Sequence, residues 1–95
     1  MAINVILPTA FIRHTAGKKQ LTSNAADLRA LIADIDVSFP ALATQIKDEF
    51  GKVRRFINIY VNDEDIRFLG GETYAFREGD EVMLIPSIAG GSAKA

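Results

Sequence analysis

One segment with a helical period lies between segments that alternate like β-strands, and this order limits the folds open to the chain. The helical segment carries a single apolar stripe at spacings i, i+3, i+4 and i+7, formed by Leu28, Leu31, Ile32 and Ile35. Asn24 is the expected N-cap, with Asp27 as its capping-box partner. The helix should end before Pro40, because the residue before a proline avoids the helical region.

Strand-like segments flank this helix on both sides. In the strongest of them Ile57, Ile59 and Val61 share one face. We expect strands at residues 2–8, 18–23, 54–62, 66–69 and 81–86. Residues 9–17 and 62–65 are typical of turns, and residues 41–50 of a short second helix or an irregular turn.

This order of elements predicts an α+β protein with a β-grasp (ubiquitin-like) fold, in which a mixed sheet has one main helix packed across it. A generic α+β sandwich is the competing architecture. The chain has 95 residues, which is the size of one domain.

Composition excludes several classes of function. Lys and Arg number 11 and Asp and Glu 12, a balance that argues against a nucleic-acid binder and against a polybasic membrane-surface protein. The absence of cysteine excludes disulfides, thiolate metal sites and a cysteine nucleophile. No apolar run approaches the roughly 20 residues that span a bilayer, and the N-terminus lacks the pattern of a signal peptide. We expect a cytoplasmic protein that interacts with neither membranes nor nucleic acid.

Few side chains suggest chemistry. The acidic run at residues 63–65 lacks the ligand spacing of a metal loop and is interpreted as a solvated turn. His14 has no nucleophile or paired carboxylate near it in the sequence, and Gly70-Gly71 is typical of a turn rather than a phosphate-binding loop. A local basic patch, interpreted as a solvated edge or a protein-docking face, contains Lys47, Lys52, Arg54 and Arg55.

The pair Gly90-Gly91 follows the last strand after only a few residues and is the most informative motif. Glycines pass through channels too narrow for other residues, so such a tail can carry a terminal carboxylate into the active site of another protein. The alternative is a flexible tail with two glycines by chance. Residues 87–95 have small side chains and no apolar period, so we expect them to be poorly ordered.

Three stretches, residues 55–67, 79–86 and 88–91, resemble the MoaD/ThiS group of ubiquitin-like sulfur carrier proteins. The likeness is closest to carriers for cysteine or homocysteine synthesis, which share the run Asn-Ile-Tyr-Val-Asn-Asp-Glu-Asp found at residues 58–65. The small subunit of molybdopterin synthase is the alternative within this group. A ubiquitin-like protein modifier and a non-catalytic interaction module are the alternatives outside it.

The resemblance implies a protein co-substrate rather than an enzyme. An E1-like adenylyltransferase would use ATP to adenylate the carboxylate of Gly91, and sulfide would then convert it to a thiocarboxylate. An acceptor sulfhydrylase or synthase would receive the sulfur. Ile88, Ala89 and Gly90 would occupy the partner's channel, and the carrier itself would hold no cofactor or metal and have no catalytic residue.

Gly91 is not the last residue of this chain, because Ser92-Ala93-Lys94-Ala95 follows it. The resemblance implies a sulfur carrier domain at residues 1–91 and an extension at residues 92–95 that a JAMM-type metalloprotease removes between Gly91 and Ser92. The alternative is a cloning remnant or a variant tail. In the resemblance, carriers dock through their sheet face, and the candidate docking residues are Phe56, Tyr60 and Phe68.

Overall fold

The computed structural model describes residues 2–87 of the chain. In chain order its elements are β1 (Ile3–Ile6), α1 (Thr9–Ile12), η1 (Arg13–Thr15), β2 (Gln20–Ser23), α2 (Leu28–Ser38), α3 (Pro40–Ile46), β3 (Ile57–Val61), β4 (Glu64–Asp65), η2 (Ile66–Leu69), η3 (Gly71–Thr73) and β5 (Glu81–Pro86), where η denotes a 3₁₀ helix.

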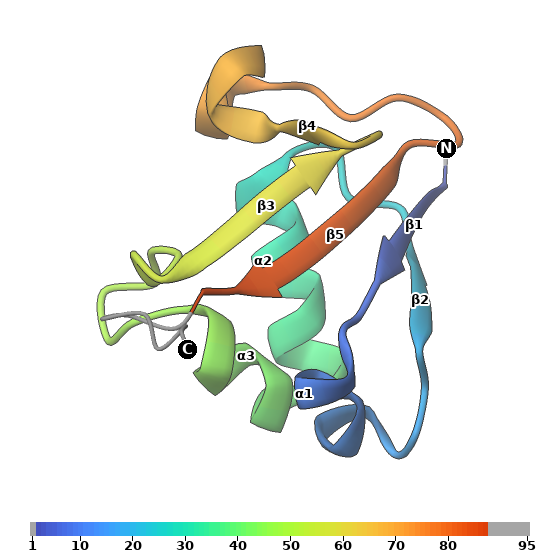
Figure 1. Cartoon of the computed structure of the whole chain (residues 1–95), viewed down its shortest axis with the longest axis vertical. Helices are drawn as coiled ribbons and strands as arrows, with labels where there is room; N and C mark the ends of the chain where they lie inside the picture. Colours follow the sequence, from blue (N-terminus) through green and yellow to red (C-terminus); the bar gives the residue numbers. More distant parts are fainter. Residues whose placement is uncertain (1, 88–95) are drawn as a thin grey trace.

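The five strands form one mixed sheet in the order β2-β1-β5-β3-β4. β1 and β5 run parallel, and the other neighbouring pairs are antiparallel. α2 crosses one face of this sheet, and α3 lies beside it (Figure 1). The predicted β-grasp arrangement, with one main helix packed across a mixed sheet, is therefore confirmed.

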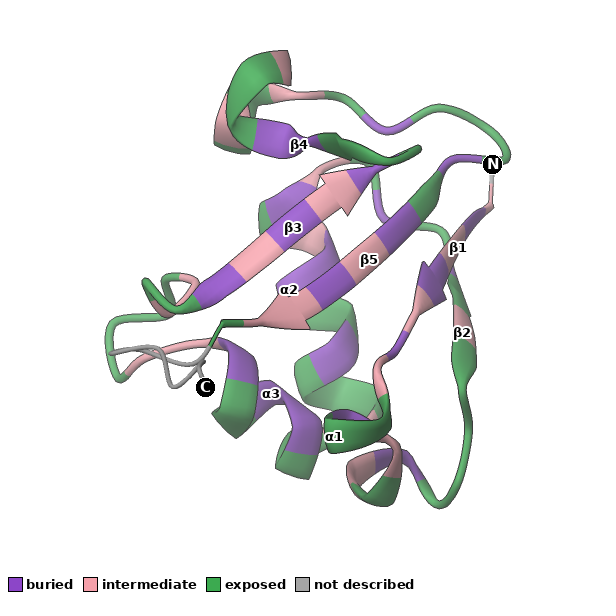
Figure 2. Ribbon diagram, viewed as in Figure 1, coloured by how far each residue is buried: buried purple, intermediate pink, exposed green. Residues whose placement is uncertain are grey.

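The apolar stripe of α2 packs against the sheet as the sequence predicts. Leu31 is fully buried, and the other three stripe residues are no more than 6% exposed. Burial alternates along β3 and β5, so each strand turns one face to the helix and the other to the open side of the sheet (Figure 2). One continuous core contains the stripe, the inward side chains of the strands and the buried face of α3.

The prediction that Asn24 caps α2 is wrong. The helix begins at Leu28, and the carboxylate of Asp27 accepts a hydrogen bond from the backbone N–H of Ala30 at 2.9 Å. Residues 24–27 are held by a distant segment instead: Asp27 forms a β-bridge with Ala75, and the N–H of Phe76 donates to the carbonyl of Ala26. These tertiary bonds delay the start of the helix.

The strand predicted at residues 66–69 is also wrong, because this segment forms η2. The carboxylate of Asp65 accepts the N–H of Arg67, and Gly70, with φ at 109°, ends the 3₁₀ helix. The preceding turn consists of two residues rather than four. Asn62 and Asp63 both have positive φ, 52° and 70°, as a tight hairpin turn requires, so the paired strand β4 begins at Glu64.

The remaining differences are smaller. Residues 9–17, expected as a turn, contain α1 and η1, and residues 41–50 contain most of α3. β3 begins at Ile57 rather than at residue 54, because the N–H of Arg54 donates to Ile46 at the end of α3. No helix within residues 2–87 is long and apolar enough to cross a membrane.

Candidate functional site

β5 leads directly to the tail and lies in the middle of the sheet, between β1 and β3. Ser87 follows β5, and both its N–H and its hydroxyl donate to the carbonyl oxygen of Phe56, at 2.7 and 3.0 Å. The chain thus leaves the sheet at a defined point beside the start of β3. Ser87 is the one residue of the predicted poorly ordered tail that the structure describes, and its order stays a prediction. The other tail residues named from the sequence, Ile88, Ala89, Gly90, Gly91 and Ser92, lie outside the described residues.

The sheet face opposite α2 carries apolar side chains near this exit. The strand register places Ile6, Met83 and Tyr60 in one row across β1, β5 and β3, and Ile85 lies two residues further along β5. All four are half-buried. An antiparallel sheet face in contact with water normally carries polar residues. Of these four, only Tyr60 is a docking residue predicted from the sequence, although the alternation of β5 already places Met83 and Ile85 on this face.

The three candidate docking aromatics differ in exposure. Phe68 is 79% exposed, Phe56 is 41% exposed and Tyr60 is half-buried. The prediction that at least one of the three is unusually exposed for an aromatic residue is therefore confirmed. Phe56 precedes β3, Tyr60 lies in it, and Phe68 lies in η2 beyond β4. Within residues 2–87 the contact between aromatic rings is the one between Tyr74 and Phe76, and it involves none of the three candidates. The structure therefore does not bring the three rings together. Their role in docking stays a prediction.

A buried carboxylate fixes the start of β5. Asp80 is 6% exposed and accepts hydrogen bonds from the side-chain amide of Asn62, the hydroxyl of Tyr74 and the N–H of Arg77, each at 2.9 Å. Asn62 in turn accepts the N–H of Glu81 at 3.0 Å. Burial alone would raise the pKa of Asp80, but these three bonds outweigh it and hold the pKa below its usual value. Burial and the bond to Asp80 raise the pKa of Tyr74.

The acidic run is a solvated turn only in part. Asp63 and Glu64 are exposed, whereas Asp65 is buried and its carboxylate bonds the guanidinium of Arg67, with the closest contact at 2.6 Å. The hydrogen bonds from Arg67 lower the pKa of Asp65, and the same pairing raises the pKa of Arg67. Within residues 2–87 no group of three or more His, Asp or Glu side chains is arranged to hold a metal ion.

Two of the four cations in the basic patch have partners among the described residues. Lys47 bonds Asp36 at 2.8 Å, and the guanidinium of Arg54 donates to the carbonyl of Thr44. Lys52 and Arg55, with Arg54 and Arg67, line a hollow of about 400 Å³ beside β3. Arg55 immediately precedes Phe56, so this hollow lies next to the exit of the tail.

The remaining candidates are structural. His14 is half-buried in η1, and no hydrogen bond to a nucleophile or carboxylate is found for it in the described part of the chain. Gly70 and Gly71 have φ values of 109° and 62° and join η2 to η3, as the turn interpretation predicts.

Comparisons with known proteins agree with this geometry. The model of the ThiS family matches residues 6–91. The sulfur carrier protein CysO of Mycobacterium tuberculosis is 40% identical over 93 residues, which cover 96% of this chain and 100% of the relative.

Solved structures also resemble this chain. The chain superposes on CysO from the Amycolatopsis orientalis BexX/CysO complex with a TM-score of 0.81 and 36% identity, covering 94% of this chain and 99% of that one. SAMP1 from Haloferax volcanii shares the fold, with a TM-score of 0.79 at 20% identity over 96% of this chain and 100% of SAMP1.

The family match over residues 6–91, together with 40% identity along the whole length of a sulfur carrier protein, shows that this chain belongs to the ThiS family of ubiquitin-like sulfur carrier proteins.

Proposed function

We propose that this chain carries sulfur as a thiocarboxylate on Gly91. The observation that carries the proposal is where the family match ends: it covers residues 6–91, so its last residue is the second glycine of the Gly-Gly pair. The structure adds a firm base for such a tail, because Ser87 is bonded to Phe56 at the end of the central strand. Gly91 lies four positions beyond Ser87, and a fully extended chain of four residues spans at most roughly 14 Å.

The chemistry requires a partner enzyme at each step. A carboxylate oxygen of Gly91 attacks the α-phosphorus of ATP and releases pyrophosphate, which leaves an acyl adenylate. Sulfide then attacks the acyl carbon, the bond to AMP breaks, and a thiocarboxylate remains. The carrier contributes an accessible carbonyl on a narrow backbone, and the E1-like adenylyltransferase supplies the nucleotide site.

Residues that follow Gly91 must be removed first, since a peptide bond leaves no carboxylate to activate. A JAMM-type metalloprotease that hydrolyses the bond between Gly91 and Ser92 would release the active form. In this proposal residues 1–91 form the carrier domain and residues 92–95 the removable extension.

The open sheet face is the proposed contact with these enzymes. Ile6, Met83 and Tyr60 form an apolar row on it, and Phe56 lies where the tail leaves the sheet. Half-exposed apolar side chains grouped on a small protein are typical of interaction surfaces. A CysO that is 36% identical to this chain has been solved in complex with BexX, which supports binding of a protein partner.

The acceptor in this proposal is bound by a sulfhydrylase or synthase of sulfur amino acid synthesis in the cytoplasm. The support is the run at residues 58–65 and the identity to CysO.

The test compares the chain ending at Gly91 with the full-length chain. Each is incubated with an E1-like adenylyltransferase, ATP and sulfide, and its intact mass is measured. Replacing oxygen by sulfur adds about 16 Da, the same mass as one oxygen on a methionine sulfoxide. The chain has no cysteine, so iodoacetamide alkylates the thiocarboxylate selectively and separates the two products.

We expect the alkylated product only from the form ending at Gly91. Alkylation of the untrimmed chain, or none of the trimmed chain, would refute the proposal. A stable isopeptide adduct between Gly91 and lysines of other proteins would indicate a modifier instead.

A further inference from the structure

One edge of the sheet is open to pairing. β2 is the outermost strand on its side, and the N–H of Leu7 donates to the carbonyl of Lys19 at 2.9 Å. Bonded and non-bonded residue pairs alternate along an antiparallel ladder, so Val5 and Leu21 form the next bonded pair. The backbone N–H and C=O groups of Gln20 and Thr22 therefore point away from the sheet.

The opposite edge is protected in a way that β2 is not. β4 has only two residues and continues into η2, which blunts that side of the sheet. Along β2, no proline interrupts the strand, and no described strand covers it. Unpaired backbone groups on an edge strand are a template for an added strand.

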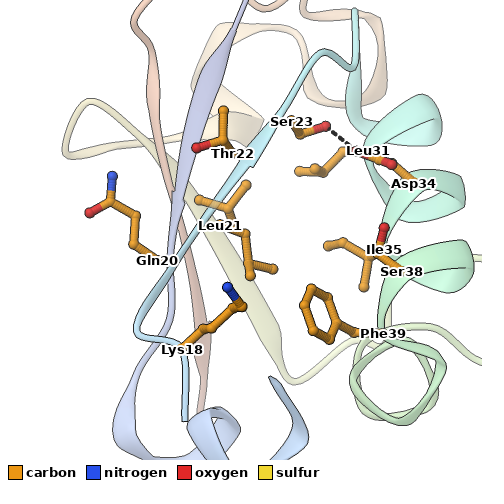
Figure 3. A pocket seen from close by; sticks show the side chains of 11 residues that line it. Lys18, Gln20, Leu21, Thr22, Ser23, Leu31, Asp34, Ile35, Ser38 and Phe39 are labelled. Atoms are coloured by element: carbon orange, nitrogen blue, oxygen red, sulfur yellow. Dashed lines mark hydrogen bonds between the residues drawn. The ribbon is translucent and has the colours of Figure 1, made fainter. Parts of the chain in front are cut away.

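A groove of about 330 Å³ runs beside this edge, between β2 and α2 (Figure 3). Leu21, Ile35 and Phe39 point into it, whereas Gln20 and Thr22 point away from it (Figure 3). Leu21 and Phe39 are only half-buried. Apolar side chains of an added strand would remove this surface from water, which stabilises binding.

The two ends of the groove differ in charge. At one end the hydroxyl of Ser23 donates to the carboxylate of Asp34 at 2.6 Å, so that carboxylate already has a partner (Figure 3). At the other end Lys18 lines the groove, is exposed and forms no ion pair with a described carboxylate. Thr15 is fully buried, and its hydroxyl oxygen lies 2.8 Å from the carbonyl oxygen of Lys18, so the backbone at this cation is held in place.

We propose that this groove binds an extended segment of a partner protein. The segment pairs antiparallel with β2, the stronger of the two orientations, places apolar side chains between β2 and α2, and ends in carboxylates beside Lys18. The charge of Lys18 assigns the occupant. Lys18 lies just before β2, where the C-terminal end of a segment paired antiparallel with β2 would lie.

This surface is separate from the one that delivers the tail. β2 is two strands away from β5, and the tail leaves on the β3 side, at Phe56. A partner held at β2 would leave the tail and the open sheet face free. It would raise the effective concentration of the carrier near any enzyme linked to that partner.

The test uses the ¹⁵N-labelled protein and a synthetic peptide, Ser-Val-Ile-Val-Ile-Glu-Glu, with blocked termini. Binding should shift the backbone amide signals of Gln20 and Thr22 and slow their hydrogen exchange. A second peptide with two lysines in place of the two glutamates should bind about tenfold more weakly. Equal binding of both peptides, shifts confined to the open sheet face, or no shifts at millimolar peptide would overturn the proposal.

Two pairs of variants sharpen the result. Lys18→Glu should weaken the glutamate peptide about tenfold, while Lys52→Glu, the same charge change in the hollow beside β3 and away from β2, should have no effect. Thr22→Pro removes an outward N–H without cutting a bond to β1 and should abolish binding, while Thr22→Ala should retain it. Thermal melting checks the fold of Thr22→Pro, and the charge variants decide the question if that variant unfolds.

A dimer that exchanges β2 edges would also show amide shifts at Gln20 and Thr22, but without peptide. Sedimentation of the free protein at increasing concentration distinguishes this case, and a dimer would overturn the peptide assignment. No arm of the experiment measures loading of Gly91, so its failure would leave the proposed sulfur carrier function standing.

Discussion

Replacing Asp80 by Asn tests whether one buried carboxylate organises the start of the strand that carries the tail. Its two oxygens accept three hydrogen bonds, one from Asn62 and two from Tyr74 and Arg77. An asparagine at this position has one acceptor oxygen and one NH2 donor group in place of the two carboxylate oxygens. Asn62 cannot turn its own oxygen toward the new amide without losing its bond to Glu81, so at least one bond is lost in either orientation.

The magnitude follows from these contacts. Loss of a hydrogen bond to a charged acceptor costs about 1.5–3 kcal/mol. The bonds that remain change from charge-assisted to neutral and lose about half their strength, while the neutral side chain is less costly to bury. We expect Asp80→Asn to lower the free energy of unfolding by about 2–4 kcal/mol at pH 7, the sum of these terms.

The same bonds set a pH dependence. The pKa of Asp80 is lower in the folded chain than its ordinary value, so the unfolded chain takes up the proton first as the pH falls. The contribution of Asp80 is therefore complete well above the ordinary aspartate pKa of about 3.9 and is lost as the pH falls through the lower, folded value. The difference in stability between wild type and Asp80→Asn should shrink over that range.

Urea unfolding followed by far-ultraviolet circular dichroism measures both effects, with the two proteins compared at pH 7 and at a series of values below pH 4. Tyr74→Phe is the matched control, because it removes one donor and keeps the carboxylate charged. Equal stability of wild type and Asp80→Asn at pH 7 would refute the reasoning. So would a difference that stays constant down to the most acidic sample in which both proteins remain folded.

Three further predictions concern the core, the tail and the exposed aromatics. Leu31→Ala should lower the free energy of unfolding by about 2–5 kcal/mol, because Leu31 is fully buried. Val37→Ala, at a position 84% exposed on the same helix, should change it little, and equal melting temperatures of the two variants would contradict this packing. Gly91→Val should block formation of the thiocarboxylate in the form ending at residue 91 without changing the melting temperature, and normal loading in the mass assay would show that the channel accepts a branched side chain. Phe68→Ser should raise the KM of the adenylyltransferase for the carrier, whereas Phe50→Ser, at a similarly exposed position, should not, and equal effects would mean that Phe68 is no anchor.

Much of the fold was predictable because its signals are local. A side chain that must face the core recurs every second residue in a strand and every third or fourth in a helix, so Ile57, Ile59 and Val61 and the stripe of α2 could be assigned from spacing alone. The Gly-Gly pair could be recognised for a related reason: what it contributes is a missing side chain, which is visible in the sequence itself.

The failures come from bonds that no periodic pattern records, some to a distant segment and some between near neighbours in the chain. Asn24 has the chemistry of an N-cap, but the backbone of residues 26 and 27 is bonded to residues 76 and 75, and α2 starts later. Asp65 looks like part of a solvated acidic turn, yet it is buried and paired with Arg67 once β4 has turned back along β3.

The sequence by itself determined the main helix and the main strands, the side chains on their buried faces and the tail that marks the family. The tertiary structure alone decided which strand lies at an edge of the sheet, which cation lines the groove without an ion pair to a described carboxylate, and which carboxylate is buried. Asp80 and Asn62 are 18 residues apart and no periodic pattern links them; they meet because β3 and β5 pair in one register. Periodicity records which way a side chain faces, whereas its partner is set by the packing of the whole chain.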